Sequence, residues 1–145
     1  MRILTNLFPE GKKTALTMSY DDGCDSDKRL VEIFNKNGIK GTFHLNSVHM
    51  SKPGNGRVQF DEVKDLYKGH EVSCHTFTHP HPTCVPDTML VNEILEDRRA
   101  LEKACGYTVR GGICSVCFGK AGRRACRDCG AGRKKRPDWL IDGAR

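Results

Sequence analysis

Two short segments of the sequence carry carboxylate and imidazole side chains at spacings that could bind a metal ion. Asp21-Asp22-Gly23 offers adjacent carboxylates, and the HTFTH segment places His75 and His79 four residues apart. Either pattern alone is common in turns and at structural histidines. Together, two histidines and one carboxylate with an open coordination position are typical of a catalytic Zn²⁺ or a related divalent ion. Such an ion lowers the pKa of bound water, whose proton a neighbouring carboxylate can accept.

The surrounding sequence predicts strands that alternate with helices. Strand-like runs cover residues 15–20, 39–45 and 70–75, and each is followed by a helical pattern, over residues 26–38, 61–67 and 87–106. This alternation predicts parallel strands joined by crossover helices. The longest predicted helix has one apolar stripe, formed by Leu90, Val91, Ile94, Leu95 and Leu101.

The candidate site residues follow the first and third predicted strands. Loops at the carboxyl ends of parallel strands converge, so we expect Asp21 and Asp22 to lie near His75 and His79. A helical turn over the HTFTH segment would direct both imidazoles to one side. Prolines at 80, 82 and 86 instead favour a rigid loop. His44, on the second predicted strand, is interpreted as a structural histidine.

These residues resemble the polysaccharide deacetylases, also called the NodB-homology family. Ser19-Tyr20-Asp21-Asp22-Gly23 is similar to the first motif of that family, commonly TFDDG, and the HTFTH segment of residues 75–79 is similar to its second motif, H-[ST]-x-x-H. The run Gly41-Thr42-Phe43-His44-Leu45 resembles its second strand. The likeness extends over about residues 12–111, where Arg110-Gly111 resembles the start of the third motif.

The resemblance implies a role for each matching residue. Asp21 would be the general base, and Arg110 would orient it. Asp22, His75 and His79 would bind the metal, which is Zn²⁺ or another divalent ion such as Co²⁺ or Mn²⁺. The implied reaction is hydrolysis of N-acetyl groups on a polysaccharide or oligosaccharide, so the expected partner is an N-acetylated saccharide.

Chain length and composition limit the expected fold. The chain has 145 residues, whereas a complete barrel of alternating strands and helices needs about 200–250. We therefore predict a truncated, partial (β/α) barrel of the deacetylase type over residues 1–111. No histidine follows His81, so the family's late general-acid histidine has no counterpart, which predicts impaired activity. Neither a membrane-spanning run nor a signal sequence is recognised, which predicts a cytoplasmic protein without a membrane partner.

Residues 112–145 form a basic tail rich in Cys, Arg and Gly. Residues 110–145 hold 10 lysine and arginine residues against 3 acidic ones, whereas residues 1–109 hold 14 against 15. The tail contains two C-x2-C pairs, Cys114 with Cys117 and Cys126 with Cys129, which could form a non-catalytic zinc module. Its basic run 133–136 could contact nucleic acid, a partner that we do not expect. We favour a third interpretation of the tail, a shifted reading frame that leaves it irregular. An inactive remnant is an alternative to the deacetylase for the chain as a whole.

Overall fold

The computed structural model describes residues 8–113, so the predictions for the tail cysteines and the basic run fall outside the described residues. The described chain alternates strands and helices, as the sequence predicts, with 3-10 turns between some of them. In chain order the elements are η1 (Pro9–Gly11), β1 (Ser19–Asp21), α1 (Asp27–Lys36), β2 (Thr42–Leu45), η2 (Ser47–Ser51), α2 (Val63–Leu66), β3 (Glu71–Cys74), η3 (Pro82–Cys84) and α3 (Asp87–Cys105).

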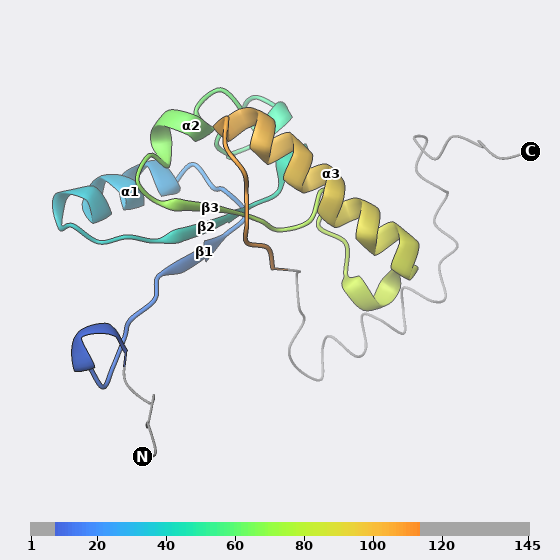
Figure 1. Cartoon of the computed structure of the whole chain (residues 1–145). Coiled ribbons are helices and arrows are strands. Elements are labelled where there is room, and N and C mark those ends of the chain that lie inside the picture. Colours follow the sequence, from blue (N-terminus) through green and yellow to red (C-terminus); the bar gives the residue numbers. More distant parts are fainter. Residues whose placement is uncertain (1–7, 114–145) are drawn as a thin grey trace, which may run out of the picture.

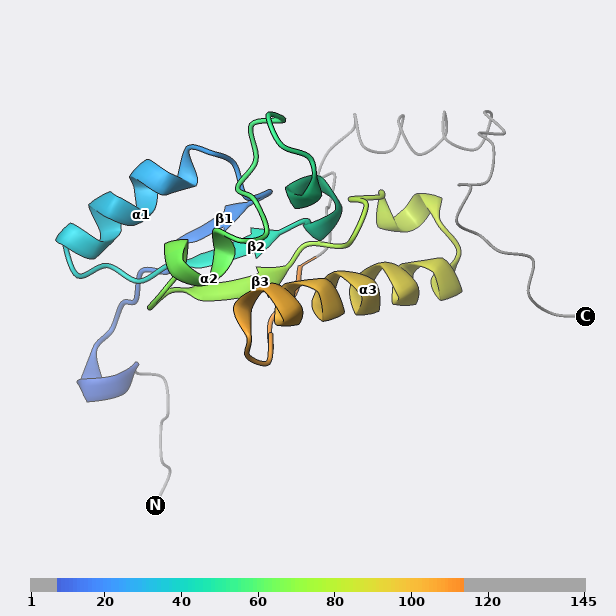
Figure 2. The same ribbon diagram turned by 90° about the horizontal axis from the view of Figure 1, so that it is seen from above.

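The three strands form one parallel sheet in the order β1-β2-β3. Asp21 pairs with His44, which in turn pairs with Ser73. The three α-helices lie over one face of the sheet (Figure 1), and Figure 2 looks down on that helical layer. After α3 the chain returns to β3, where Cys74 and Gly112 form a parallel bridge. This arrangement is the expected α/β fold with crossover helices.

The hydrophobic core lies between the sheet and the helices. Phe43 is fully buried at its centre, and its ring centroid lies 4.7 Å from that of Tyr67 and 5.8 Å from that of Tyr20. Full burial of one such side chain contributes about 1.5–3 kcal/mol to folding. The core consists of Val31, Phe34, Phe43, Leu45, Met50, Val58, Val63, Tyr67, Val72, Cys74, Leu101, Cys105 and Val109.

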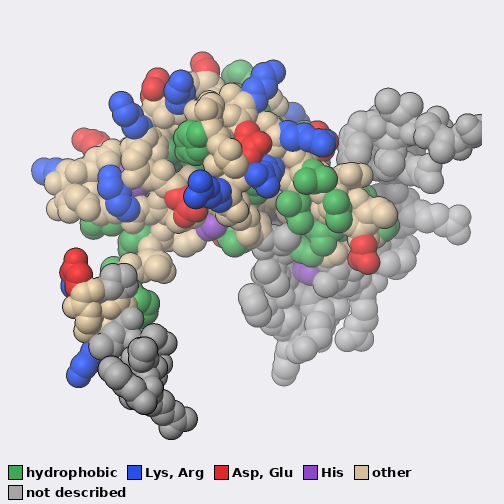
Figure 3. All heavy atoms as spheres, in the orientation of Figure 1, with side chains coloured by type: hydrophobic (Ala, Val, Ile, Leu, Met, Phe, Trp, Pro, Cys, Tyr) green, Lys and Arg blue, Asp and Glu red, His purple; other side chains and the backbone are tan. Residues whose placement is uncertain are grey.

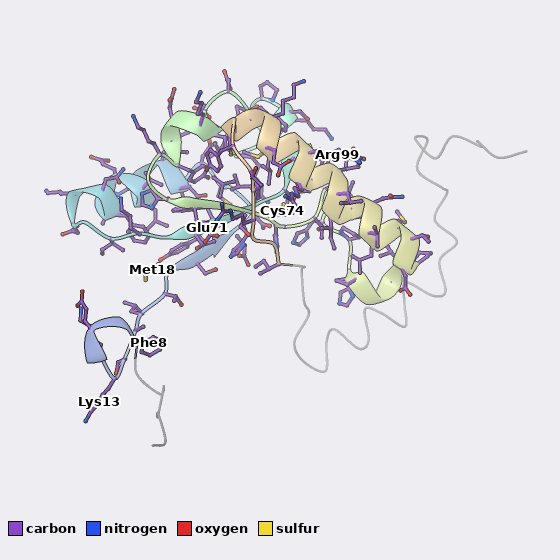
Figure 4. All side chains as sticks on the ribbon, in the orientation of Figure 1. Phe8, Lys13, Met18, Glu71, Cys74 and Arg99 are labelled. Carbon is purple, nitrogen blue, oxygen red and sulfur yellow. The ribbon has the colours of Figure 1, made fainter. Side chains whose placement is uncertain are left out.

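The other face of the sheet carries polar side chains, because successive residues of a strand point to opposite faces. Ser19 Oγ lies 2.7 Å from His44 Nε2, and the Thr42 hydroxyl donates a 2.7 Å hydrogen bond to Glu71 Oε2. His44 is only 6% exposed; its Nε2 contacts Ser19, whereas its buried Nδ1 has no hydrogen-bond partner among residues 8–113. Figure 4 labels Glu71 and Cys74 near the two ends of β3.

Of the apolar stripe predicted on α3, Leu101 is buried in the core, whereas most of the remaining side chains are not. Val91, Ile94 and Leu95 are 53%, 39% and 40% exposed, whereas Glu93 and Asp97 are almost fully buried. Hydrophobic side chains are accordingly visible over part of α3 in Figure 3. The loops on which the first half of α3 packs contain backbone N–H groups. The carboxylates of Glu93 and Asp97 accept hydrogen bonds from them, which apolar side chains could not do.

The N-terminal described segment lies apart from the helices. Figure 1 shows η1 joined to β1 by an extended stretch, and Figure 4 labels Phe8 and Lys13 beside it. The predicted strand 15–20 is therefore shortened, since pairing with β2 begins only near Met18, whose carbonyl accepts the Thr42 N–H. Within residues 8–113, no helix has the length and apolar character needed to cross a membrane.

Candidate metal centre

Three ligand atoms from two distant segments converge at the carboxyl end of the sheet. Asp22 Oδ1 lies 3.6 Å from the Nε2 atoms of both His75 and His79, and these two nitrogens are 3.1 Å apart. His75 is buried, whereas the side chains of Asp22 and His79 are about one-third exposed. The cluster is therefore packed against the protein at His75 and open to solvent at Asp22 and His79.

Asp22 is held at the end of β1 by its own backbone. Its N–H donates to the His44 carbonyl at 2.8 Å, which continues the pairing of β1 with β2. Its φ of 75° lies in the left-handed region, where aspartate occurs more readily than most residues. Gly23 follows with φ 62°, and a Cβ there would lie 3.0 Å from Leu45 Cδ2. The turn that presents Asp22 thus requires the glycine found in the sequence motif.

The segment from His75 to His79 is a loop, as the prolines that follow it predict, and not a helical turn. Thr76 and His79 adopt φ values of 68° and 58°. Of the four non-glycine residues with positive φ in the described chain, three lie in this loop or at Asp22. Such conformations are costly and persist where the surroundings enforce them, often at functional sites.

The hydrogen bond of His75 fixes which ring nitrogen carries its proton. His75 Nδ1 lies 3.1 Å from the carbonyl oxygen of Ile113, which can only accept. Nδ1 is therefore the protonated nitrogen, and the lone pair of Nε2 faces Asp22 and His79. Metal-binding histidines are typically oriented in this way by a hydrogen bond from the other ring nitrogen.

Burial disfavours protonation of the second histidine. It lowers the pKa of His79, with a further lowering from His75, while the Asp22 carboxylate acts in the opposite direction. Burial also lowers the pKa of His44, which lies beneath the cluster with its ring centroid 6.4 Å from that of His75. A neutral imidazole is the form that binds a metal.

The donor set fits a divalent cation. A tetrahedral Zn²⁺ site with bonds of about 2.0–2.1 Å spaces its donor atoms about 3.3 Å apart. The three distances between the donor atoms of Asp22, His75 and His79 are 3.1–3.6 Å. All three ligand atoms lie within 4.8 Å of one another. Two imidazoles and one carboxylate also leave a coordination position open for water or substrate.

The two predicted catalytic residues are not joined to each other. Asp21 ends β1 with an exposed side chain, and its charge acts to raise the pKa of nearby His44. Arg110 is exposed and lines a cleft together with Thr76 and Arg98. Within residues 8–113, no hydrogen bond or ion pair links the Arg110 guanidinium to Asp21.

Several residues that the sequence did not single out support the cluster. Arg57 Nη1 donates to the Asp22 carbonyl at 2.8 Å and lies 3.5 Å from Asp22 Oδ2. Asn46 Nδ2 donates to the carbonyls of His75 and Thr76. Glu93 and Asp97 contact the same loop from α3. None of these stands in a motif. Only Glu93 and Asp97 have a sequence signal, which is a charged residue amid apolar ones on the predicted last helix.

The fold and the cluster coincide with a match to a known family. The model of the polysaccharide deacetylase family matches residues 9–128, so this chain belongs to that family. A chitin deacetylase from Arthroderma benhamiae is 39% identical over 66 residues, which is 44% of this chain. The peptidoglycan-N-acetylglucosamine deacetylase PgdA of Listeria monocytogenes is 29% identical over 99 residues, or 66% of this chain. This chain covers 17% and 20% of those proteins, respectively.

Solved structures show the same fold. The Streptococcus pyogenes deacetylase PplD, in complex with acetate, matches 86% of this chain and 56% of its own with a TM-score of 0.69 at 15% identity. A family 4 carbohydrate esterase from Streptomyces lividans matches 79% of this chain and 58% of its own, with a TM-score of 0.55 and 20% identity. An acetyl xylan esterase from Clostridium thermocellum, solved with a cobalt ion, matches 66% and 46% with a TM-score of 0.54 at 16% identity.

Proposed function

We propose that this chain provides the metal centre of a hydrolase that removes acetyl groups from an N-acetylglucosamine-containing polysaccharide. The observation that carries the proposal is the convergence of Asp22, His75 and His79 within 3.1–3.6 Å of one another. The names of the curated relatives, a chitin deacetylase and a peptidoglycan deacetylase, support the substrate class. Membership of the deacetylase family supports the reaction.

In the proposed mechanism, Asp22, His75 and His79 hold a divalent cation, with Zn²⁺, Co²⁺ or Mn²⁺ as candidates. The bound cation would polarise the acetamide carbonyl and lower the pKa of water. Asp21, adjacent to Asp22 and exposed, accepts a proton as water attacks the carbonyl carbon. The carbon–nitrogen bond then breaks as the amine nitrogen takes up the proton held by Asp21, so acetate and the sugar amine leave. Arg110 is proposed to orient the Asp21 carboxylate when substrate is present.

Metal content tests the proposal directly. We expect the purified full chain to bind about one Zn²⁺ per molecule, and His75→Ala and His79→Ala each to lower the affinity by at least about tenfold because one of three ligands is lost. Isothermal titration with Zn²⁺ measures this. His49→Ala, which removes an imidazole outside the cluster, is the matched control and should bind as the original chain does. Acetate release from chitin oligomers then reports whether the loaded chain is a catalyst.

The alternative zinc module makes the opposite prediction. If the tail cysteines hold the metal, Cys114→Ser combined with Cys117→Ser removes most of it, while His75→Ala has little effect. That result would contradict the proposed centre. Asp21→Asn separates binding from chemistry, because it should leave Zn²⁺ affinity near that of the original chain and abolish acetate release.

A further inference from the structure

Two buried carboxylates on α3 contact the backbone of the loop that carries the histidine ligands. Asp97 Oδ2 accepts a hydrogen bond from the His75 N–H at 2.9 Å, and Asp97 Oδ1 accepts one from the Ser47 N–H at 2.8 Å. Glu93 Oε2 accepts from the Thr78 N–H at 2.6 Å, and its Oε1 accepts from the Thr78 hydroxyl at 2.7 Å. The two acids lie one helical turn apart, on the same side of α3.

The burial of these acids is costly without compensating bonds. Asp97 is 0% exposed and Glu93 is 2% exposed. A carboxylate removed from water destabilises a fold unless hydrogen-bond donors or charges satisfy it. Here all four carboxylate oxygens face N–H or O–H donors of the loops after β2 and β3. The core therefore contains two carboxyl groups whose four oxygens hold these loops.

The donors belong to the strained part of the chain. The His75 and Thr78 N–H groups each directly precede a left-handed residue, Thr76 and His79 respectively. A third anchor, the Phe77 N–H, donates to the main-chain carbonyl of Glu93 at 3.1 Å. Consecutive attachments to one rigid helix thus hold the segment in a conformation that its own backbone disfavours.

We propose that Glu93 and Asp97 are positioning residues that fix the His75–His79 loop so that both imidazoles face Asp22. The inference rests on the metal centre proposed above. Asp97 also bonds the Ser47 N–H after β2, so the same side chain ties the ligand loop to the neighbouring strand end. Neither acid contacts the ligand atoms themselves, and their effect passes through the backbone.

The number of acceptor oxygens makes the two acids respond differently to amide substitution. Both oxygens of Asp97 face backbone N–H groups, which only donate, so Asp97→Asn must set an NH₂ group against one of them. Glu93 faces one N–H group and one hydroxyl, and the hydroxyl can reverse to accept. We therefore expect Glu93→Gln to keep both bonds, whereas Glu93→Ala loses them.

Cobalt binding by the full chain tests this pattern. Titration with Co²⁺, followed by visible absorption, should show affinity reduced by about 10–100-fold in Asp97→Asn and in Glu93→Ala. Glu93→Gln should restore affinity close to that of the original chain. Glu96→Gln, an exposed substitution on the same helix, is the matched control and should bind Co²⁺ unchanged. Far-UV circular dichroism confirms that each variant is folded.

Amide hydrogen exchange in the metal-free chain provides a readout that does not depend on the metal. We expect faster exchange at His75 and Thr78 in Asp97→Asn and Glu93→Ala, and unchanged exchange in Glu96→Gln. Equal exchange and equal Co²⁺ affinity in all folded variants would overturn the inference. Absence of Co²⁺ binding by the original chain would instead overturn the proposed function, and the exchange rates would still decide whether the two acids position the loop.

Discussion

At the scale of single residues, the turn after β1 depends on a position without a side chain. Gly23 combines φ 62° with a space in which a Cβ would meet Leu45 Cδ2 at 3.0 Å. Gly38, at the end of α1, has a similar φ of 66° but nothing within 4 Å of an added Cβ. Comparison of substitutions at the two glycines therefore separates the cost of backbone strain from the cost of crowding.

Gly23→Ala should lower the free energy of unfolding by about 1–3 kcal/mol, because strain and crowding act together. Gly38→Ala should cost only the strain, about 1–2 kcal/mol. Urea denaturation of both variants measures the difference. Equal losses would show that the Leu45 side chain moves aside and that crowding contributes nothing.

Most of the cluster could be predicted at this scale, since Asp22, His75 and His79 stand in short motifs at strand ends. The supporting residues could not. Glu93 and Asp97 lie where the helix period suggests surface, because sequence periodicity records which residues are apolar and not which loops need hydrogen-bond acceptors. Arg57 reaches Asp22 from a loop 35 residues further along the chain, and no local spacing indicates that contact.

At the scale of elements, a single buried hydrogen bond joins α1 to the end of α2. The Tyr67 hydroxyl donates to Asp27 Oδ2 at 2.8 Å, and Asp27 is 5% exposed at the start of α1. Burial raises the pKa of Asp27, and the Tyr67 bond opposes that rise. The bond thus offsets part of the cost of a buried carboxylate.

Tyr67→Phe should destabilise the fold by about 1–3 kcal/mol, since it leaves a buried acceptor without its donor. Tyr20→Phe is the control, because the Tyr20 hydroxyl makes no hydrogen bond to residues 8–113 while its ring packs on Phe34. Thermal unfolding monitored by circular dichroism compares the two. A loss as large in Tyr20→Phe would contradict a specific role for the Asp27 bond.

The predicted element boundaries agree with the structure best where tertiary contacts and local pattern coincide. The helices predicted at residues 26–38 and 87–106 are observed as Asp27–Lys36 and Asp87–Cys105. The first strand was predicted from residue 15 because its residues favour extended structure, yet β1 begins at Ser19. Leu16 is 86% exposed, and a strand without a neighbour gains no ladder hydrogen bonds.

At the scale of the whole molecule, buried neutral histidines make stability depend on pH. The Gly41 N–H donates to His70 Nδ1 at 3.2 Å, so Nε2 carries the proton and contacts Asn35 Oδ1. Burial lowers the pKa of His70, and the Lys40 charge lowers it further. Protonation of His70 Nδ1 would place its N–H opposite the Gly41 N–H, so two donors would face each other.

The sign of the pH effect follows from this lowered pKa. As the pH falls, His70 binds a proton in the unfolded chain near its ordinary pKa of about 6.5, and in the folded chain only at a lower pH. The contribution of His70 to stability is therefore fully present above about pH 6.5 and is lost as the pH drops below it. Urea unfolding between pH 7 and pH 5 should show this decline, and His70→Gln, which offers one acceptor and one donor, should make it shallower. Lys40→Met should also reduce the slope, because it removes the charge that opposes protonation. An unchanged slope in both variants would assign the decline to other groups.

The helix that fixes the ligand loop lies downstream of it in the sequence. Asp97 follows His79 by 18 residues, which a ribosome adds in about 1–4 s at roughly 5–20 residues per second. The imidazole of His79 therefore emerges from the ribosome 18 residues ahead of the Asp97 carboxylate. In the nascent chain, cation binding at the proposed centre would have to wait until α3 has emerged and packed against the loop.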